Sequence, residues 1–583
     1  MQPTLVHRRG RALASLTAVM GLALGAAAVG NAPAQSAAPT PDCTPYSGAL
    51  TKGDAVTAMS VTSGTTPQEF DGQVLGVLQD GIAPDLDMIM VEITAPDPDK
   101  IGGIWQGMSG SPVYASNGEV IGAIAYGLSW GPSWIAGVTP FADMDDYMTA
   151  AAAPAKVKVS DAQALTIARS SDVTRTQAAA GFSQLPMPTG VSGVSNRRLN
   201  QAENHRAKHK WVPKSSYRMG SAAVAGDANA AGPETIEPGG NLAASLSYGD
   251  ITMGGVGTVT AVCNDKVVGF GHPMTFLGET TLTLHPADAL FIQPESLGAP
   301  FKVANLGAPA GTISDDHLTG ITGFLGAAPA TTDVTSTVAF RDRERSGTTH
   351  VSVPEAMAST VFYESVGNHD RVVDGAIAGS ELLEWTIAGH DSDGTPFNLQ
   401  VTDRFASDYD ITYESAWDLA DFVWSLSRIP GVTLDGVTMD SQVDVDHSVW
   451  ELSKLQQRIG GAWVKAGKGA PVLARAGKAL KMRAVLTSGS ATRTVPVSVS
   501  IPANASGGEG RIEFTGGAYL WSEDAYPRSI EQAEKYAATM VRNDEVQVQL
   551  GLYSKRKQIQ KSATSEPQDK VVTGHKHVRV FVK

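Results

Sequence analysis

The stretch GGIWQGMSGSPVYASNGEVIGAIAYG (102–127) joins a glycine-rich turn to a β-hairpin. Two apolar runs, 111–115 and 119–126, flank the pair Asn-Gly at 117–118. Asn-Gly between apolar runs predicts a hairpin, because both turn positions need a positive φ. The turn Gly-Met-Ser-Gly (107–110) comes just before the first run. The stretch therefore predicts a serine presented at the start of a hairpin.

The sequence on either side of this stretch has a β pattern as well. Three Val-, Ile- and Met-rich runs precede it, separated by Gly, Pro and Asp: AVTAMSV (55–61), GQVLGVL (72–78) and MIMVEIT (88–94). Such runs bounded by turn residues are typical of strands. Similar runs return from 239 to about 360. We therefore expect a mainly β protein.

Composition limits the class of protein. A chain of 583 residues predicts three to five domains. Apolar residues make up 42% and charged residues 18%, which excludes a coiled coil and a wholly disordered chain. The net charge of −14 argues against a nucleic-acid partner, because polyphosphate binding needs surplus Lys and Arg. Two cysteines are too few for a disulfide-stapled fold or a four-cysteine zinc site.

The N-terminus predicts export. Arg8, Arg9 and Arg11 precede an uncharged apolar run (12–30), and Ala-Pro-Ala (32–34) follows it. This is the layout of a secretory signal peptide, with a retained membrane anchor as the alternative. No later stretch is apolar enough to span a membrane, so we expect no stable membrane insertion after cleavage. Export permits a disulfide between Cys43 and Cys263, but the sequence does not show that they are close.

The chain divides into segments of different character. We expect a signal peptide (1–34), a flexible leader (35–53), a serine-bearing half-domain (54–149), a linker or insertion (150–238), a histidine-bearing half-domain (239–360), a mixed α/β connector (361–435) and a β-rich, sandwich-like accessory module (436–583). Helices are predicted at 416–429 and 529–541 from apolar residues at helical spacing. A basic run at 197–214 reads as a solvated face, with contact to a polyanionic cell surface as the alternative.

Ser109 is the candidate nucleophile. Acyl-transfer enzymes need a serine on a tight turn, where glycine lets the substrate carbonyl approach the backbone. The backbone N–H groups of Gly107 and Ser109 are then candidates for an oxyanion hole. Ser111 is a second possible nucleophile. A Gly/Ser turn without chemistry is the alternative interpretation.

His272 is the candidate general base. Beyond the signal peptide, every histidine follows Ser109 in the chain. His272 ends an apolar strand in GFGHP (269–273), where glycine and proline restrict the backbone. Such a platform suits an imidazole that must take a proton from a serine hydroxyl. His285 is the second choice, and a structural histidine is the alternative for both.

These segments together resemble the SpoIVB-type serine peptidases, a sporulation signalling family of the chymotrypsin-like clan. The resemblance is carried by 102–127, by GVTPFADM (137–144), by VVGFGHPM (267–274) and by FKVANLGAPAGTISDDHLTGITGFLG (301–326). It covers well under half of the chain. It implies a chymotrypsin-like double β-barrel built from two separated segments, with Ser109 as nucleophile and His272 as base.

The resemblance has one departure and leaves one residue open. In the family the histidine segment precedes the serine segment, whereas here Ser109 comes first, so the half-barrels are exchanged in chain order. The third catalytic residue is expected at Asp97, near where the family carries an acid. Other candidates are Asp99, Asp288, Asp315 and Asp316, and a Ser/His dyad without an acid is also open.

The sequence thus favours an exported or cell-envelope serine endopeptidase that needs no cofactor or metal. Its partner would be a polypeptide substrate or the chain itself, and the C-terminal region could contact a cell-surface partner. The alternative is a catalytically inactive peptidase-like scaffold or binding protein of the cell envelope. No nucleic-acid chemistry, phosphate loop or zinc motif is found in the sequence.

Overall fold

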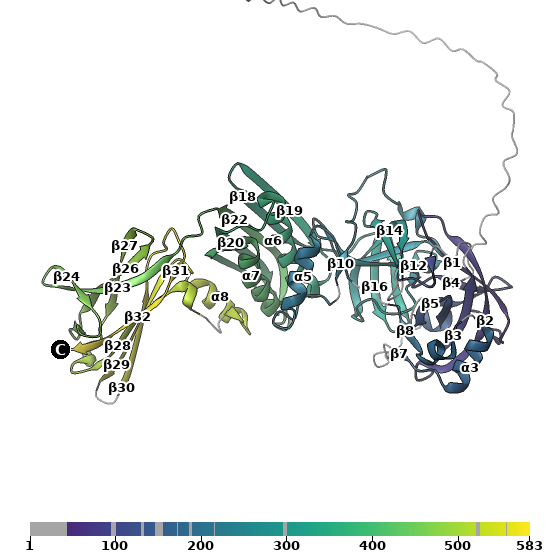
Figure 1. Ribbon diagram of the computed structural model, residues 1–583, viewed down its shortest axis with the longest axis horizontal. Coiled ribbons are helices and arrows are strands. Elements are labelled where there is room, and N and C mark those ends of the chain that lie inside the picture. The colour runs from purple at the N-terminus through teal and green to yellow at the C-terminus, as the bar shows by residue number, and fades with distance from the viewer. Residues whose placement is uncertain are drawn as a thin grey trace, which may run out of the picture. The chain divides into compact units, whose positions relative to one another are not determined.

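The computed structural model describes residues 43–94, 101–129, 133–145, 156–171, 173–185, 189–214, 216–294, 300–520, 525–554 and 557–583. The predicted signal peptide and the first part of the predicted leader, 35–42, lie outside the described residues. The chain is mainly β, with two closed six-stranded antiparallel barrels and further sheets (Figure 1).

The first barrel contains the predicted hairpin. Its strands are β1 Ala55–Ser60, β2 Gln68–Ala83, β3 Leu86–Thr94, β4 Pro112–Ala115, β5 Val120–Leu128 and β6 Ile135–Pro140. Their order is β4-β1-β2-β3-β6-β5, and pairing of β4 with β5 closes the barrel. The central strand β5 is buried on both faces for most of its length, which explains its continuous apolar run.

The second barrel repeats this topology. Its strands are β11 Asn241–Gly249, β12 Met253–Cys263, β13 Lys266–Gly269, β14 Gly278–Gln293, β16 Gly311–His317 and β17 Gly320–Leu325. The order β12-β13-β17-β16-β14-β11 closes through β11 and β12. When the six strands of each barrel are numbered along the chain, their order around the barrel is 1-2-3-6-5-4 in both barrels. The two barrels form the expected chymotrypsin-like double barrel from two separated segments.

The segment between the barrels, expected as a linker or insertion, contains helices and short strands. It contains α3 Asp161–Ser170, α4 Arg175–Ala179, α5 Asn196–His205, β7 Lys156–Val157, β8 Phe182–Gln184, β9 Gly190–Val191 and β10 Tyr217–Arg218, after the short α2 Phe141–Asp145. Strand β8 pairs with β5, and β9 pairs with β12, so the segment extends both barrel sheets.

A helix-covered sheet follows the second barrel. It comprises β18 Thr332–Phe340, β19 Arg343–Val351, β20 Gly379–His390, β21 Pro396–Ser407 and β22 Thr433–Asp444, with helices α6 Met357–Val373, α7 Ile411–Ser427 and α8 Ile530–Thr539. Helix α6 packs against β18 and β19, and α7 packs against α6, β20 and β21 (Figure 1). The expected domain boundary at 360/361 falls inside α6. The helix and the strands on both sides of that boundary share one hydrophobic core, so they belong to the same layer.

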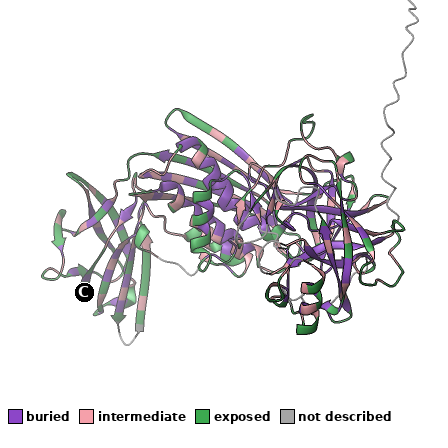
Figure 2. Ribbon diagram, turned by 45° about the vertical axis from the view of Figure 1, so that its right-hand side comes forward, coloured by how far each residue is buried: buried purple, intermediate pink, exposed green. Residues whose placement is uncertain are grey.

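The C-terminal region is a β-sandwich. One sheet holds β23 Trp450–Ile459, β24 Ala462–Ala466, β26 Ala479–Ser488, β27 Ala491–Ser500 and β31 Val572–Thr573; the other holds β25 Val472–Ala474, β28 Glu509–Gly516, β29 Val546–Ser554, β30 Lys557–Thr564 and β32 His575–Val582. Buried and exposed residues alternate along these strands (Figure 2). The buried faces form one separate core.

The two cysteines form a disulfide. Cys43 and Cys263, 220 positions apart, are bonded, with their Cα atoms 5.9 Å apart. The bond attaches the start of the described chain to the end of β12. Among the described residues, no helix has both the length and the apolar character required to cross a membrane.

Candidate functional site

The serine turn is held by its own backbone. Gly107 and Gly110 have φ angles of 96° and 97°, the left-handed region that favours glycine. The Met108 N–H donates to the Trp105 carbonyl over 3.1 Å, and the Ser111 N–H donates to the Met108 carbonyl over 2.9 Å. The turn comes directly before β4, so it places Ser109 at the start of the β4–β5 hairpin.

Strand β12 of the second barrel fastens this turn from the opposite side. The Thr258 N–H donates to the Ser109 carbonyl over 2.8 Å, and the Thr258 hydroxyl donates to the Gly107 carbonyl over 3.0 Å. The Thr260 hydroxyl donates to the Gly110 carbonyl over 2.8 Å. The serine turn is therefore part of the contact between the barrels.

The first barrel in turn holds the backbone next to His272. His272 lies between β13 and β14, after Gly271, whose φ is 69°. The Thr139 hydroxyl, on β6 of the first barrel, donates to the Gly271 carbonyl over 2.6 Å. Each barrel thus holds the backbone beside the candidate residue of the other barrel.

The structure brings Ser109 and His272 together. The Ser109 Oγ lies 2.7 Å from the His272 Nε2. The His272 Nδ1 lies 2.7 Å from the Pro273 carbonyl oxygen, which can only accept a hydrogen bond. In the neutral ring Nδ1 therefore carries the proton, and Nε2 accepts from the serine hydroxyl. This is the tautomer that a general base for Ser109 needs.

Burial keeps this imidazole neutral. His272 and Ser109 both have 0% exposure. Removal from water lowers the pKa of His272 to about 4, and the Pro273 carbonyl and the Asp316 charge oppose this shift only in part. The imidazole is therefore unprotonated, and able to accept a proton, across the neutral pH range.

Asp316 is the acidic residue associated with this histidine. Its carboxylate is buried and accepts hydrogen bonds from the Met274 N–H (2.8 Å), the Thr275 N–H (2.7 Å) and the Thr275 hydroxyl (2.6 Å). These donors belong to the loop that follows His272. Asp316 therefore fixes the histidine loop and places a negative charge near the ring.

None of the other sequence candidates that the structure describes takes part in the contact between Ser109 and His272. Asp97 and Asp99 lie outside the described residues. The Ser111 Oγ is buried without a hydrogen-bond partner among the described residues, so no base activates it there. The His285 ring is held by the Ser245 hydroxyl and the Gly307 carbonyl, which indicates a structural role.

Two backbone N–H groups remain for an oxyanion. Within the described part of the chain, the N–H groups of Gly107 and Ser109 donate no hydrogen bond to protein atoms. Both residues are buried. Unpaired buried N–H groups are rare, and a pair beside a nucleophile suits a developing negative charge.

Sequence reasoning missed Lys302. This buried lysine on β15 Phe301–Leu306 lies so close to Gly107 that a Cβ added there would meet the Lys302 Cβ at 2.8 Å. Its Nζ donates to the Asn241 Oδ1 over 2.8 Å, and burial lowers the pKa of its ammonium to about 7. The only hint in the sequence is that Lys302 is the single charged residue of an apolar run, FKVANL (301–306).

Comparisons with known proteins add no assignment. No family model, no curated protein and no solved structure matches this chain. In the described ranges, no cluster of three or more His, Cys, Asp or Glu side chains is arranged to hold a metal ion. The interpretation of the site therefore depends on its geometry.

Proposed function

We propose that the protein is an exported serine endopeptidase in which Ser109 is the nucleophile and His272 the general base. The observation that carries this proposal is the 2.7 Å contact between the Ser109 Oγ and the His272 Nε2. The resemblance to the SpoIVB-type peptidases supports the same roles. A disulfide is typical of an oxidising compartment, so the Cys43–Cys263 bond supports export to the cell envelope or beyond.

The proposed reaction follows from these positions. The Ser109 Oγ attacks the carbonyl carbon of a peptide bond while its proton passes to the His272 Nε2. Negative charge develops on the carbonyl oxygen, where the N–H groups of Gly107 and Ser109 stabilise it. The protonated His272 returns the proton to the leaving amine as the C–N bond breaks. A water molecule, deprotonated by His272, then hydrolyses the acyl-enzyme and releases Ser109.

Asp316 acts as a positioning residue in this proposal. Its hydrogen bonds hold the loop at 274–275, and its charge favours the imidazolium that forms when His272 takes the proton. The Pro273 carbonyl accepts the Nδ1–H hydrogen bond and so keeps the ring in the required tautomer. In a Ser-His-Asp triad one carboxylate both orients the imidazole and stabilises its positive charge. Here the Pro273 carbonyl does the first and Asp316 the second.

A second function, that of a non-catalytic scaffold, is favoured by one observation. Ser109 and His272 are both fully buried. A peptide can reach the hydroxyl only if the surrounding residues move. In the scaffold alternative they do not move, and the double barrel serves as a binding module of the cell envelope.

Cleavage of an unfolded protein substrate tests the proposal. Wild-type protein is incubated with fluorescein-labelled casein beside Ser109→Ala, His272→Ala and, as a matched control, Ser111→Ala. Ser111 suits the control because its Oγ is buried without a partner. We expect a loss of at least about 10³-fold in the first two variants and wild-type cleavage in the control. Cleavage that survives in Ser109→Ala contradicts the proposal, and absence of cleavage in every protein supports the scaffold.

A further inference from the structure

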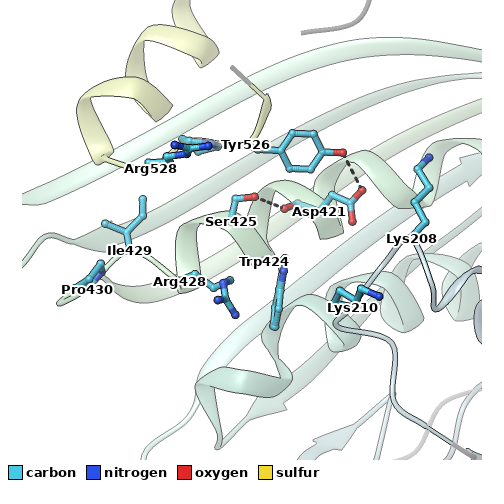
Figure 3. Close-up of a pocket in the computed structure, with 11 residues that line it drawn as sticks. Lys208, Lys210, Asp421, Trp424, Ser425, Arg428, Ile429, Pro430, Tyr526 and Arg528 are labelled. Carbon is cyan, nitrogen blue, oxygen red and sulfur yellow. Dashed lines mark hydrogen bonds between the residues drawn. The ribbon is translucent and has the colours of Figure 1, made fainter. Parts of the chain in front are cut away.

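A pocket far from Ser109 in sequence lies against helix α7. It has a volume of about 510 Å³ and is lined by Lys208, Lys210, Asp421, Trp424, Ser425, Arg428, Ile429, Pro430, Tyr526, Pro527 and Arg528 (Figure 3). Three segments supply these residues: the loop after α5, the second half of α7 with its following turn, and the residues before α8. The basic run noted in the sequence supplies Lys208 and Lys210.

The walls of the pocket are held together without a ligand. The Asp421 Oδ1 accepts hydrogen bonds from the His209 Nδ1 (2.7 Å) and the Trp211 Nε1 (2.8 Å). The Tyr526 hydroxyl donates to the Asp421 Oδ2 over 3.5 Å (Figure 3). One carboxylate on α7 therefore connects all three segments, and the pocket is preformed.

The lining carries an excess of positive charge. Lys208, Lys210, Arg428 and Arg528 are exposed, and none of them forms an ion pair with another described residue. The one acidic residue of the lining, Asp421, already accepts hydrogen bonds from the walls. The Lys208 charge also interacts with Asp418, and the other three cations have no acidic partner within ion-pair distance among the described residues. In a chain with a net charge of −14, four cations around one pocket create a local site of attraction for anions.

The cations are spread around the pocket. Figure 3 shows Lys208 and Lys210 toward one end and Arg528 toward the other, with Arg428 between them beside Trp424. The Arg428 guanidinium lies over the Trp424 ring, 5.1 Å from its centre. Separate charges of this kind suit a ligand with several negative groups along its length better than one phosphate ion.

The remaining lining favours a peptide over a sugar polymer. It contains the apolar surfaces of Trp424, Ile429 and Pro527 and no Asn or Gln side chain. The hydroxyl of Ser425 donates to the Asp421 backbone carbonyl over 3.0 Å. Few acceptors therefore remain for sugar hydroxyls, whereas the charged donors match carboxylates and the apolar surface matches a large side chain.

We infer that this pocket binds an acidic peptide segment that carries at least one large apolar side chain. Its carboxylates pair with Lys208, Lys210, Arg428 and Arg528, and its apolar side chain contacts Trp424. Binding here is separate from any chemistry at Ser109.

Fluorescence anisotropy with a short fluorescein-labelled peptide of alternating Glu and Leu tests the inference. The full-length protein carries Ser109→Ala, so that cleavage cannot affect the result. We expect saturable binding that weakens about tenfold or more in the double variant Lys210→Glu/Arg428→Glu. The matched control is Lys454→Glu/Lys481→Glu, the same charge change at two exposed lysines of the sandwich, and it should bind like the parent.

Two further experiments test separately the roles of the peptide's carboxylates and of its apolar side chains. The same peptide with Gln in place of Glu should bind at least about tenfold more weakly, and Trp424→Ala should weaken binding of the Glu/Leu peptide several-fold. No saturable binding of that peptide, or equal loss in the sandwich control, contradicts the inference. So does a heparin oligosaccharide that binds the pocket more tightly than the peptide, since the ligand would then be a polyanionic glycan.

Discussion

Ser109 and His272 occupy the same topological position in two different barrels. Ser109 lies between the third and fourth strands of the first barrel, and His272 lies between the third and fourth strands of the second. Their side chains meet with 2.7 Å between Oγ and Nε2. Because the strand order is the same in both barrels, exchanging the barrels along the chain leaves two equivalent loops facing each other. A chain order in which Ser109 precedes His272 is therefore compatible with contact between the two side chains.

The pH dependence of Ser109 reactivity should reflect the buried histidine. The pKa of His272 is lowered to about 4 by burial, so the ring is unprotonated above that pH and loses its basicity below it. The rate of Ser109 modification by a fluorophosphonate should therefore rise with a midpoint near pH 4. A midpoint near 6.5, the ordinary histidine value, would show that the ring is solvated when it reacts.

Asp316→Ala should lower the reactivity of Ser109, because it removes the hydrogen bonds that hold the loop after His272. Loss of the carboxylate leaves the N–H groups of Met274 and Thr275 without their acceptor, so we expect modification of Ser109 to slow about tenfold or more. The Asp316 charge raises the pKa of His272, so its removal should also move the midpoint of the pH profile to lower pH. An unchanged midpoint and rate would mean that Asp316 does not position His272.

Gly110→Ala should disrupt the contact between the barrels. A Cβ at Gly110 would lie 1.9 Å from the Thr258 carbonyl oxygen and 2.5 Å from the Phe270 nitrogen, and φ is positive as well. We expect a loss of about 3 kcal/mol or more in the free energy of unfolding, measured by thermal or urea unfolding of the full chain. Gly118→Ala is the matched control, since its φ is 86° but the added Cβ meets nothing within 4 Å. Equal effects of the two substitutions would show that backbone strain alone matters.

The Cys43–Cys263 bond should stabilise the double barrel, because the loop that it closes contains the first barrel and ends on β12 of the second. Replacing both cysteines with serine opens a loop closed over 220 positions, and we expect unfolding to become easier by about 2–5 kcal/mol. Thiol titration of the denatured, unreduced wild-type protein should find no free thiol. Two reactive thiols in that titration would contradict the disulfide.

Local sequence patterns predicted the serine turn, its hairpin and the strands before it, because these depend on neighbouring residues. The segment expected as a linker or insertion also carries a local signal for two helices. Ser160 with Gln163 and Thr174 with Gln177 form capping boxes, which begin α3 and α4.

The acid could not be chosen from the sequence. The Asp316 carboxylate accepts hydrogen bonds from Met274 and Thr275, some 40 positions earlier in the chain, and no local sequence pattern predicts such a contact. Lys302 is visible in the sequence as a lone lysine in an apolar run, but its proximity to Gly107 of the first barrel is not. The pairing of Ser109 with His272 was expected from glycine-flanked motifs and a family resemblance, since no spacing rule links residues 163 positions apart.

Covalent labelling with a fluorophosphonate probe, followed by peptide mapping, tests the central claim most directly. We predict one modified residue, Ser109, with labelling abolished in Ser109→Ala, strongly slowed in His272→Ala and unchanged in Ser111→Ala. Labelling that persists in Ser109→Ala, or a wild-type protein that takes up no probe over the pH range in which His272 is neutral, would contradict the assignment of Ser109 and His272 as a catalytic pair.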